Sequence, residues 1–277
     1  MHVKTVFELQ KVLNEPRESL ANVGFVPTMG ALHEGHLKLV KRASEENDIV
    51  VVSIFVNPTQ FNNQEDLLHY PRTLDKDLQL LKKYCNNYLV FSPEMSEIYP
   101  SEDDFKPIVL GQLDQVLEGK FRPGHFQGVV HVVHNLFKIV QPNRAYFGQK
   151  DFQQLAIIRF MTKAFFQKIE IVACETLREN SGLAMSSRNM RLSDNQKVDA
   201  LVIWRTLNFV RENKSNFTPI KLKKLAIDLF STGNLNLEYL EIVDSENLLE
   251  AQDWRRQTVC CIAAYCGEVR LIDNLLL

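Results

Sequence analysis

The sequence predicts an α/β protein with a parallel sheet, followed by a smaller α+β domain. Apolar, β-branched runs such as Ile49–Val56 alternate with stretches of helical periodicity, which is typical of parallel strands covered on both faces. The 277 residues are enough for one large domain and a second, smaller one. We therefore expect a Rossmann-like domain over residues 1–177 and an α+β domain over 178–277.

The composition is ordinary for a globular protein, with 45% hydrophobic and 24% charged residues. The formal net charge of −2 provides no overall basic field, which counts against nucleic acid as the main partner. No apolar run is long enough to span a bilayer, so we expect a cytoplasmic protein with no membrane partner. The five cysteines form no CxxC pair and lie in apolar segments, which indicates small core residues.

The most informative stretch is the first predicted strand and the helix after it. Val23–Val26 is typical of a buried strand, Pro27 and Gly30 predict a turn, and helical spacing begins beyond that turn. His33 and His36 then fall on the same face of the first helical turn. A strand end, a glycine-bearing turn and a helix N-terminus together form an anion site. Helix capping or solvent contact is the alternative interpretation of the two histidines, and zinc would need more ligands than this segment supplies.

Two later loops also follow predicted strands, so we expect them at the same edge of the sheet. Asn57–Phe61 follows Ile49–Val56, and an amide such as Gln60 can donate and accept hydrogen bonds for a hydroxyl-bearing carboxylate substrate. Turn formation is the alternative role of this loop. Lys150 follows the strand predicted at Arg144–Phe147 and precedes a helix, where it can reach a phosphate as a point charge.

The middle of the chain predicts helices and connections. Thr73 is the expected N-cap of a helix, and pairing with the helix dipole explains the aspartates of its first turn. Asp77 is also a secondary candidate ligand of Mg²⁺. We expect a loop at 92–100, a helix-to-helix connection at 117–126, and a helix over Val129–Val140.

Residues 178–189 are polar, contain glycine and have no periodicity, which predicts a linker or mobile loop. Ser186, Ser187 and Arg188 can donate several hydrogen bonds to phosphate oxygens. A loop that holds phosphates between two domains is a natural hinge. The elements predicted beyond it are helices from Ser193 to about Arg211 and from Thr218, and strands at 237–243, 258–265 and 269–272.

Taken together, these motifs resemble a known family. The string PTMGALHEGH resembles the pantothenate synthetases of the His-x-Gly-His nucleotidyltransferase superfamily, to which class I aminoacyl-tRNA synthetases also belong. The resemblance covers nearly all of the first domain through HEGH, NPTQF, YPRT, RPGHFQGV, RAYFGQKDFQQ and LAMSSRN, in that order. It is weaker after about Leu192. Gln149 also departs from the family, which has glutamate at that position of its GEKD motif.

The resemblance implies an ATP-dependent ligase that condenses (R)-pantoate with β-alanine to pantothenate. The reaction would pass through pantoyl adenylate and release pyrophosphate and AMP. ATP would be a substrate with Mg²⁺ bridging its phosphates, and the protein would be a homodimer. The first domain would bind nucleotide and pantoate, and the second would act as a lid hinged at about 178–189.

The family match also implies roles for individual residues. His36, His33 and Lys150 are the catalytic candidates, and Gln60 and Gln154 would bind pantoate or β-alanine. Phe147 would form a wall of that pocket, with Arg122 and His125 in support. The candidate ATP-binding residues are Met29, Gly30, Ala31, Leu32, His33, Glu34, Gly35, His36, Gly148, Gln149, Lys150, Asp151, Leu177, Met185, Ser186, Ser187 and Arg188.

Two alternatives stay open at this point. Another nucleotidyltransferase of the same fold would share His-x-Gly-His but should lack the paired glutamines and the RPGHF loop. A non-catalytic nucleotide sensor would not need a complete set of phosphate-binding groups. A tRNA synthetase is disfavoured by the length of the chain and by the lack of a basic appended domain. A related hydroxy acid or amine as the true substrate is compatible with the sequence.

Overall fold

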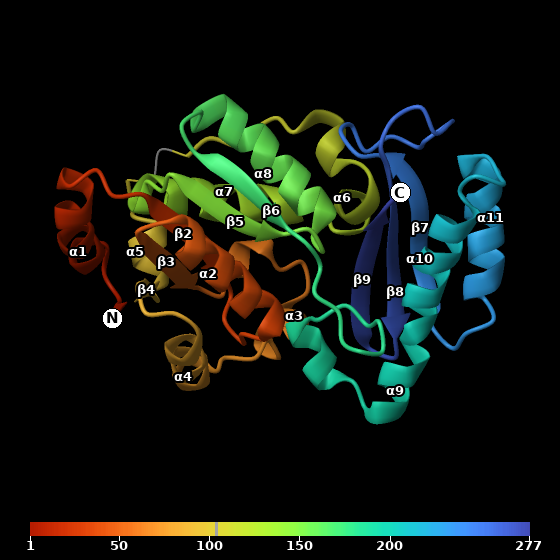
Figure 1. The fold of residues 1–277 in the computed structure, drawn as a ribbon, viewed down its shortest axis with the longest axis horizontal. Helices are drawn as coiled ribbons and strands as arrows, with labels where there is room; N and C mark the ends of the chain where they lie inside the picture. Colours follow the sequence, from red (N-terminus) through yellow and green to blue (C-terminus); the bar gives the residue numbers. More distant parts are fainter. Residues whose placement is uncertain (103–104) are drawn as a thin grey trace. The chain divides into compact units, whose positions relative to one another are not determined.

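Two sheets organise the chain in the computed structural model, which describes residues 1–102 and 105–277 (Figure 1). Each sheet belongs to one of two compact units. The units do not follow chain order, because two short segments from the middle of the chain pack with the C-terminal residues. The first unit comprises Met1–Leu110, Arg122–Gln149 and Gln154–Glu175, and the second comprises Gly111–Phe121, Lys150–Gln153 and Thr176–Leu277.

The first unit is built on a six-stranded parallel sheet, which confirms the predicted Rossmann-like architecture. Its strand order is β1-β4-β3-β2-β5-β6. Because neighbouring strands are parallel, their carboxyl ends share one edge, and the loops that leave them lie there. The strands are β1 (His2–Val3), β2 (Val23–Thr28), β3 (Ile49–Ile54), β4 (Tyr88–Phe91), β5 (Arg144–Gly148) and β6 (Glu170–Cys174).

Helices cover both faces of this sheet, as its continuously apolar strands require. The apolar side of α2 (Glu34–Glu46), including Leu37, packs with Val26 and Val50 in one core cluster. On the other face, Phe137 of α7 meets Phe25 edge-to-face, with ring centroids 6.2 Å apart. The other helices of this unit are α1 (Val6–Glu18), α3 (Gln64–Leu68), α4 (Leu74–Tyr84), α5 (Met95–Ile98), α7 (His125–Val140) and most of α8 (Phe152–Phe165).

Three local predictions need correction. Thr73 occupies the N-cap position of α4, but its side chain does not cap the helix and its hydroxyl donates to Asp77 instead. The loop predicted at 92–100 contains the short helix α5. The connection predicted at 117–126 contains α6 (Leu117–Phe121), and α7 already begins at His125. The two missed helices are short, at four and five residues, so neither shows a full helical period.

The second unit is a three-stranded antiparallel sheet packed against helices, the small α+β arrangement that the sequence predicts. Ser193 caps a helix with a reciprocal bond to Gln196, but the single helix expected there is two, separated at Ala200. Thr218 caps the next helix, which starts with proline as predicted. From residue 194 onward, the helices and strands of the second unit are α9 (Asp194–Asp199), α10 (Leu201–Asn213), α11 (Pro219–Phe230), β7 (Asn236–Asp244), β8 (Thr258–Cys266) and β9 (Val269–Leu276).

A buried ion-pair network attaches α6 to this second sheet. The guanidinium of Arg270 on β9 donates to both carboxylate oxygens of Glu118, at 2.7 and 2.8 Å. Its Nε also donates to Glu238, at 3.0 Å. The Tyr239 hydroxyl donates to Glu118 at 2.7 Å, and burial raises the pKa of that phenol well above its ordinary value. Residues from two segments of the second unit that are far apart in the sequence therefore share one charged cluster.

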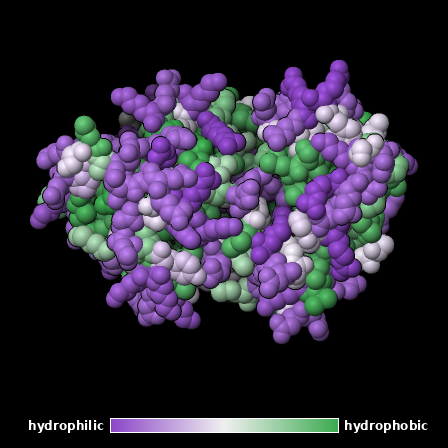
Figure 2. Space-filling view, viewed as in Figure 1, coloured by the Kyte–Doolittle hydropathy of each residue, from purple (hydrophilic) through white to green (hydrophobic). Residues whose placement is uncertain are grey.

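The surface in view in Figure 2 is mostly hydrophilic, with smaller hydrophobic areas between the polar side chains. Within residues 1–102 and 105–277, none of the helices has the length and apolar character needed to cross a bilayer. All five cysteines are buried and free, which confirms their predicted role as small core residues.

Candidate functional site

The turn after β2 forms the centre of the candidate site in the first unit. Gly30 has φ +78° and Ala31 has φ +49°, so two consecutive residues adopt the left-handed conformation. An alanine in this region costs about 1–2 kcal/mol, because its Cβ approaches the backbone. Backbone strain of this size persists only where surrounding contacts maintain it. The Thr28 hydroxyl accepts from Gly30 N at 3.1 Å and donates to Ser53 O at 2.7 Å, which joins the turn to β3.

His33 and His36 follow this turn and cap α2, with ring centroids 4.1 Å apart. Nδ1 of His33 accepts from Gly35 N at 3.1 Å, and Nδ1 of His36 accepts from His33 N at 3.4 Å. Since a backbone N–H can only donate, the proton of each neutral ring lies on Nε2. Capping therefore does not exclude a functional role for the two histidines. It fixes both rings in the tautomer whose N–H donor is Nε2.

Gln60 is brought to the Gly30–Ala31 turn by the loop after β3, as the sequence predicts. Its Nε2 lies 3.1 Å from the sulfur of Met29, and its Oε1 accepts from Asn57 Nδ2 at 3.1 Å. Asn57 is 1% exposed, and its amide also donates to Gly128 O at 3.2 Å. The Asn57 contact orients the Gln60 amide with its NH₂ group directed away from Asn57. Gln60 therefore presents its N–H donors on the side away from Asn57, where Nε2 contacts Met29.

The N-terminal part of α7 packs closely against the same loop. Nδ1 of His125 donates to Gln60 O at 2.7 Å, because a carbonyl oxygen can only accept. A Cβ at Gly128 would lie 2.4 Å from Thr59 O, so only glycine permits this approach. His125 thus supports the Gln60 loop through its backbone. The composition of the RPGHFQGV motif is explained in part by this packing.

The remaining candidates in the first unit are less tightly tied to that edge. Gln154 lies in the first turn of α8 and is half-buried. Phe147 is buried and meets Phe137 edge-to-face, with ring centroids 6.4 Å apart. Gly148 ends β5, and Gln149 N donates to Cys174 O of the neighbouring strand end. These positions are compatible with the predicted pocket but do not define it.

Lys150 and Asp151 belong to the second unit, where Asn274 holds the lysine backbone. Asn274 Nδ2 donates to Lys150 O at 2.7 Å, and Lys150 Nζ lies 3.9 Å from Asp151. The neighbouring Asp273 on β9 accepts two hydrogen bonds from Arg178, at 2.5 and 2.9 Å. Successive residues of β9 therefore fix the Lys150 segment and the start of the 178–189 loop.

The 178–189 loop is more ordered in its contacts than its composition suggests. A β-bridge joins Arg178 to Ala184, and Met185 N donates to Leu177 O at 2.9 Å. Ser186 begins a 3₁₀ helix (Ser187–Arg191) and its hydroxyl accepts from Arg188 N at 3.3 Å. The serines and the arginine thus sit on a short, hydrogen-bonded turn. Its action as a hinge stays a prediction.

Asp77 was the candidate ligand of magnesium, and the structure gives its carboxylate other partners. Oδ2 accepts from Ala31 N at 2.9 Å and Oδ1 accepts from Leu32 N at 2.8 Å. Burial raises the pKa of this carboxyl, although the two N–H donors act in the opposite direction. In the described part of the chain, no group of three or more His, Cys, Asp or Glu side chains could hold a metal ion. The contacts of Asp77 thus tie it to the turn, and its role as a magnesium ligand stays a prediction.

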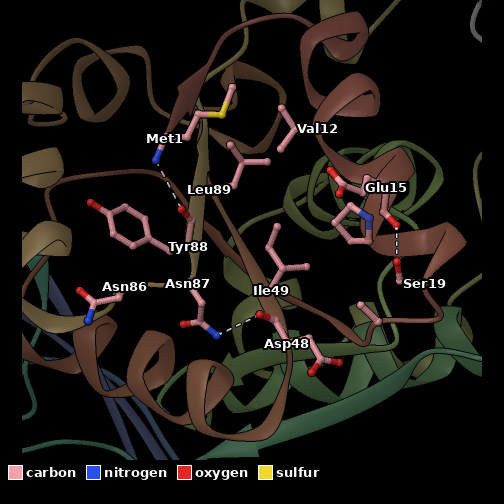
Figure 3. A pocket seen from close by; sticks show the side chains of 12 residues that line it. Met1, Val12, Glu15, Ser19, Asp48, Ile49, Asn86, Asn87, Tyr88 and Leu89 are labelled. Carbon is pink, nitrogen blue, oxygen red and sulfur yellow. Dashed lines mark hydrogen bonds between the residues drawn. The ribbon is translucent and has the colours of Figure 1, made fainter.

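The pocket shown in Figure 3 lies at the other edge of the sheet. It has a volume of about 570 Å³ and is lined by Ile49 and Tyr88, which begin β3 and β4. The Asn87 amide in its wall donates to backbone carbonyls, including Asp48 O at 3.2 Å. This pocket is therefore at the amino ends of the strands and is not the candidate site.

Sequence reasoning left Asn57 and Tyr99 outside the candidate set. Tyr99 follows α5, and its hydroxyl donates to Asn57 Oδ1 at 2.8 Å. The position of Asn57 directly after a buried strand was a usable signal, because side chains at that edge face ligands. Tyr99 had no such signal, since its role depends on a contact between residues 42 positions apart.

Comparison with known proteins gives one consistent family. The family described as pantoate-beta-alanine ligase matches residues 1–276. The pantothenate synthetase of Phocaeicola vulgatus is 51% identical over 277 residues, covering 99% of this chain and 98% of that protein. The pantothenate synthetase of Azobacteroides pseudotrichonymphae is 50% identical over 276 residues, with 99% and 98% covered.

Two solved structures extend the comparison to three dimensions. The pantothenate synthetase of Thermus thermophilus has a TM-score of 0.92 at 44% identity, with 99% of this chain and 98% of that chain covered. The pantoate-beta-alanine ligase of Francisella tularensis, complexed with beta-gamma ATP and beta-alanine, has a TM-score of 0.82 at 36% identity. It covers 100% of this chain, which in turn covers 97% of it.

Proposed function

The chain belongs to the pantoate-beta-alanine ligase family, and on that premise we propose that it uses ATP to join pantoate to β-alanine through an amide bond. The observation that carries the proposal is the contact of Gln60 with Met29, at 3.1 Å. It brings a donor suited to a small hydroxy acid against the turn that precedes His33 and His36. The Francisella relative supports ATP and β-alanine as substrates, since it was solved in complex with beta-gamma ATP and beta-alanine.

The first step would be attack of the pantoate carboxylate on the α-phosphate of ATP. A new carboxyl–phosphate bond forms as the bond to the pyrophosphate breaks, giving pantoyl adenylate and pyrophosphate. The carboxylate is already ionised at neutral pH, so this step needs no general base. Catalysis then depends on alignment and on stabilisation of the negative charge that moves onto phosphate oxygens.

His33 and His36 would supply part of that stabilisation. Their Nδ1 atoms accept backbone N–H groups, so neutral rings present Nε2–H as donors. The N-terminus of α2 adds backbone amides and the positive end of the helix dipole. We propose that these groups bind phosphate oxygens of ATP, with the backbone of Met29 and Gly30 beside the nucleoside.

Gln60 would bind the hydroxy acid through its NH₂ group. Because Oε1 is engaged by Asn57, the side chain presents donors, and both the carboxylate and the hydroxyl oxygens of pantoate are acceptors. A neutral donor also leaves the nucleophile's charge intact, whereas a lysine at this position would stabilise the ground state of the carboxylate. Gln154 is the proposed second amide of this site.

The second step would be attack of the β-alanine amine on the acyl carbon of the adenylate. A C–N bond forms, the carboxyl–phosphate bond breaks, AMP leaves and the amine releases a proton. We propose that Lys150 and the donors of the 186–188 turn bind nucleotide phosphates during the reaction. Mg²⁺ would enter as the counter-ion of ATP. A cytoplasmic homodimer is the form we propose for the protein.

The test is release of pyrophosphate from ATP and magnesium, first with pantoate alone and then with β-alanine added. We expect pantoate-dependent release that becomes multiple-turnover only with β-alanine, together with equal amounts of AMP and pantothenate. If ATP binds but neither substrate causes release, the protein is a different nucleotidyltransferase or a nucleotide sensor. Replacement of pantoate or β-alanine by a related hydroxy acid or amine tests the choice of substrate in the same assay.

A further inference from the structure

Among the described residues, Asp77 is the one carboxylate that we find in contact with the strained Gly30–Ala31 turn. It lies in the first turn of α4 and is 1% exposed. Its two oxygens accept from consecutive backbone amides, Ala31 N at 2.9 Å and Leu32 N at 2.8 Å. These are the residues between the left-handed Gly30 and the N-cap His33. The carboxylate thus holds the turn from a helix that is 45 positions away in the sequence.

Three further observations fit a clamp on the turn. A Cβ at Gly30 would lie 3.1 Å from Asp77 Oδ2, so the backbone passes close to the carboxylate. Ala31 has φ +49° although it is not glycine, and the bond from its own N–H goes to Asp77. The Thr73 hydroxyl, at the N-cap position of α4, donates to Asp77 Oδ1 at 3.2 Å. This third donor helps to orient the carboxylate.

The chemistry requires a carboxylate at this position. Both acceptor positions face backbone N–H donors, so an amide side chain would direct its own NH₂ group at one of them. The result would be two opposed donors in a buried site and one unsatisfied backbone N–H.

We infer that Asp77 is a positioning residue for ATP, which holds the Gly30–Ala31 turn in the conformation that presents the start of α2 to the phosphates. Asp77 does not touch the reacting atoms in this role, and it acts through Ala31 and Leu32. The inference rests on the proposed use of ATP at this turn but not on the identity of the hydroxy acid. Loss of the clamp should therefore weaken nucleotide binding selectively.

The experiment compares Asp77→Asn with Asp75→Asn by titration calorimetry with a non-hydrolysable ATP analogue and magnesium. Asp75 is exposed in the same helical turn, so its replacement removes the same charge near the same helix end. We expect Asp77→Asn to weaken analogue binding about tenfold, as one unsatisfied buried donor predicts, and Asp75→Asn to leave it unchanged. The KM for pantoate should stay within about twofold of wild type, since the Gln60 loop keeps its own contacts.

A milder pair keeps the test decisive if Asp77→Asn folds poorly. Thr73→Val removes the hydroxyl that orients Asp77, whereas Thr73→Ser retains it. The valine variant should weaken analogue binding roughly threefold, and the serine variant should behave as wild type. Restoration of Asp77→Asn by excess Mg²⁺ would instead show a metal ligand and overturn the inference. Unchanged analogue binding in Asp77→Asn and Thr73→Val would also overturn the inference. If wild type binds the analogue normally but turns over no pantoate, that result would count only against the proposed reaction.

Discussion

The phenolic hydroxyl of Tyr99 donates a 2.8 Å hydrogen bond to Oδ1 of Asn57. Together with Thr59 N and Thr59 Oγ1, which donate to the same oxygen at 3.3 and 3.0 Å, this bond directs the Asn57 amide toward Gln60 Oε1. It thus contributes to the orientation of the Gln60 amide that we propose binds the hydroxy acid. Tyr99→Phe should therefore raise the KM for pantoate roughly fivefold while the KM for ATP is unchanged. Steady-state pyrophosphate release at varied pantoate and ATP provides both constants.

A matched control for Tyr99→Phe is Tyr146→Phe in the same unit. The Tyr146 hydroxyl is also hydrogen-bonded, to Glu46 at 2.8 Å, but it lies in the core between α2 and β5. Its loss should lower stability without affecting the KM for pantoate. A similar rise of that KM in both variants would mean that Tyr99 acts through general stability only.

Gln60→Ala should weaken pantoate-dependent adenylation and leave ATP binding largely intact. The reason is that, in the proposed function, the side chain offers donors to the acid, while the Gly30–Ala31 turn keeps its bonds to Thr28 and Asp77. Adenylation kinetics and ATP-analogue titration measure the two effects separately. Gln127→Ala is the control, because its amide binds Ile108 O at 2.9 Å. Equal loss of acid and nucleotide binding would contradict the assignment of Gln60.

Arg270→Met should destabilise the protein by about 3 kcal/mol, because it leaves Glu118 and Glu238 buried without their cation. Urea unfolding measures the change. Adding Glu118→Gln to Arg270→Met should recover part of the loss, since the uncompensated charge is removed. Arg255→Met breaks only an exposed pair with Asp253 and should leave the unfolding midpoint unchanged. Additive losses in the Glu118–Arg270 double variant would contradict this account.

Alkaline stability should depend on Tyr146. Burial, followed by its bond to Glu46, raises the pKa of Tyr146 from 10.0 to about 12. A folded-state pKa above the unfolded value means that the folded protein holds the phenol proton more tightly. This stabilisation is complete below pH 10 and is lost as pH rises through 12. Between these values, wild type should therefore lose more unfolding free energy than Tyr146→Phe, as measured by urea unfolding at each pH.

Much of this architecture could be predicted because it depends on local pattern. The continuous apolar run at Ile49–Ile54 indicated a buried parallel strand, and the carboxyl-edge rule then brought Gln60 to the turn before His33. Capping at Ser193 and Thr218 also follows from residue type alone. These inferences use interactions that span a few residues or one strand pairing.

The parts that the sequence could not predict depend on distant partners. Thr73 occupies the predicted N-cap position, but its hydroxyl makes no cap bond and donates to the buried Asp77. Asp77 looked like a first-turn helix residue, and its real partners are backbone amides that no residue type reveals. The segment with α6 belongs to the second unit, where Glu118 binds Arg270, 152 positions away in the sequence. A local pattern has no information on such pairs.

The Glu118–Arg270 pair has a consequence for synthesis of the chain. Glu118 leaves the ribosome well before Arg270, which lies in the last strand. Until β9 is made, burial of Glu118 would leave a carboxylate without its cation, so the nascent chain must keep this segment in water. A ribosome-bound chain that stops before residue 270 should therefore expose 111–121 to protease, and completion of the last strand should protect it. Strand β9 thus determines when the 111–121 segment can fold.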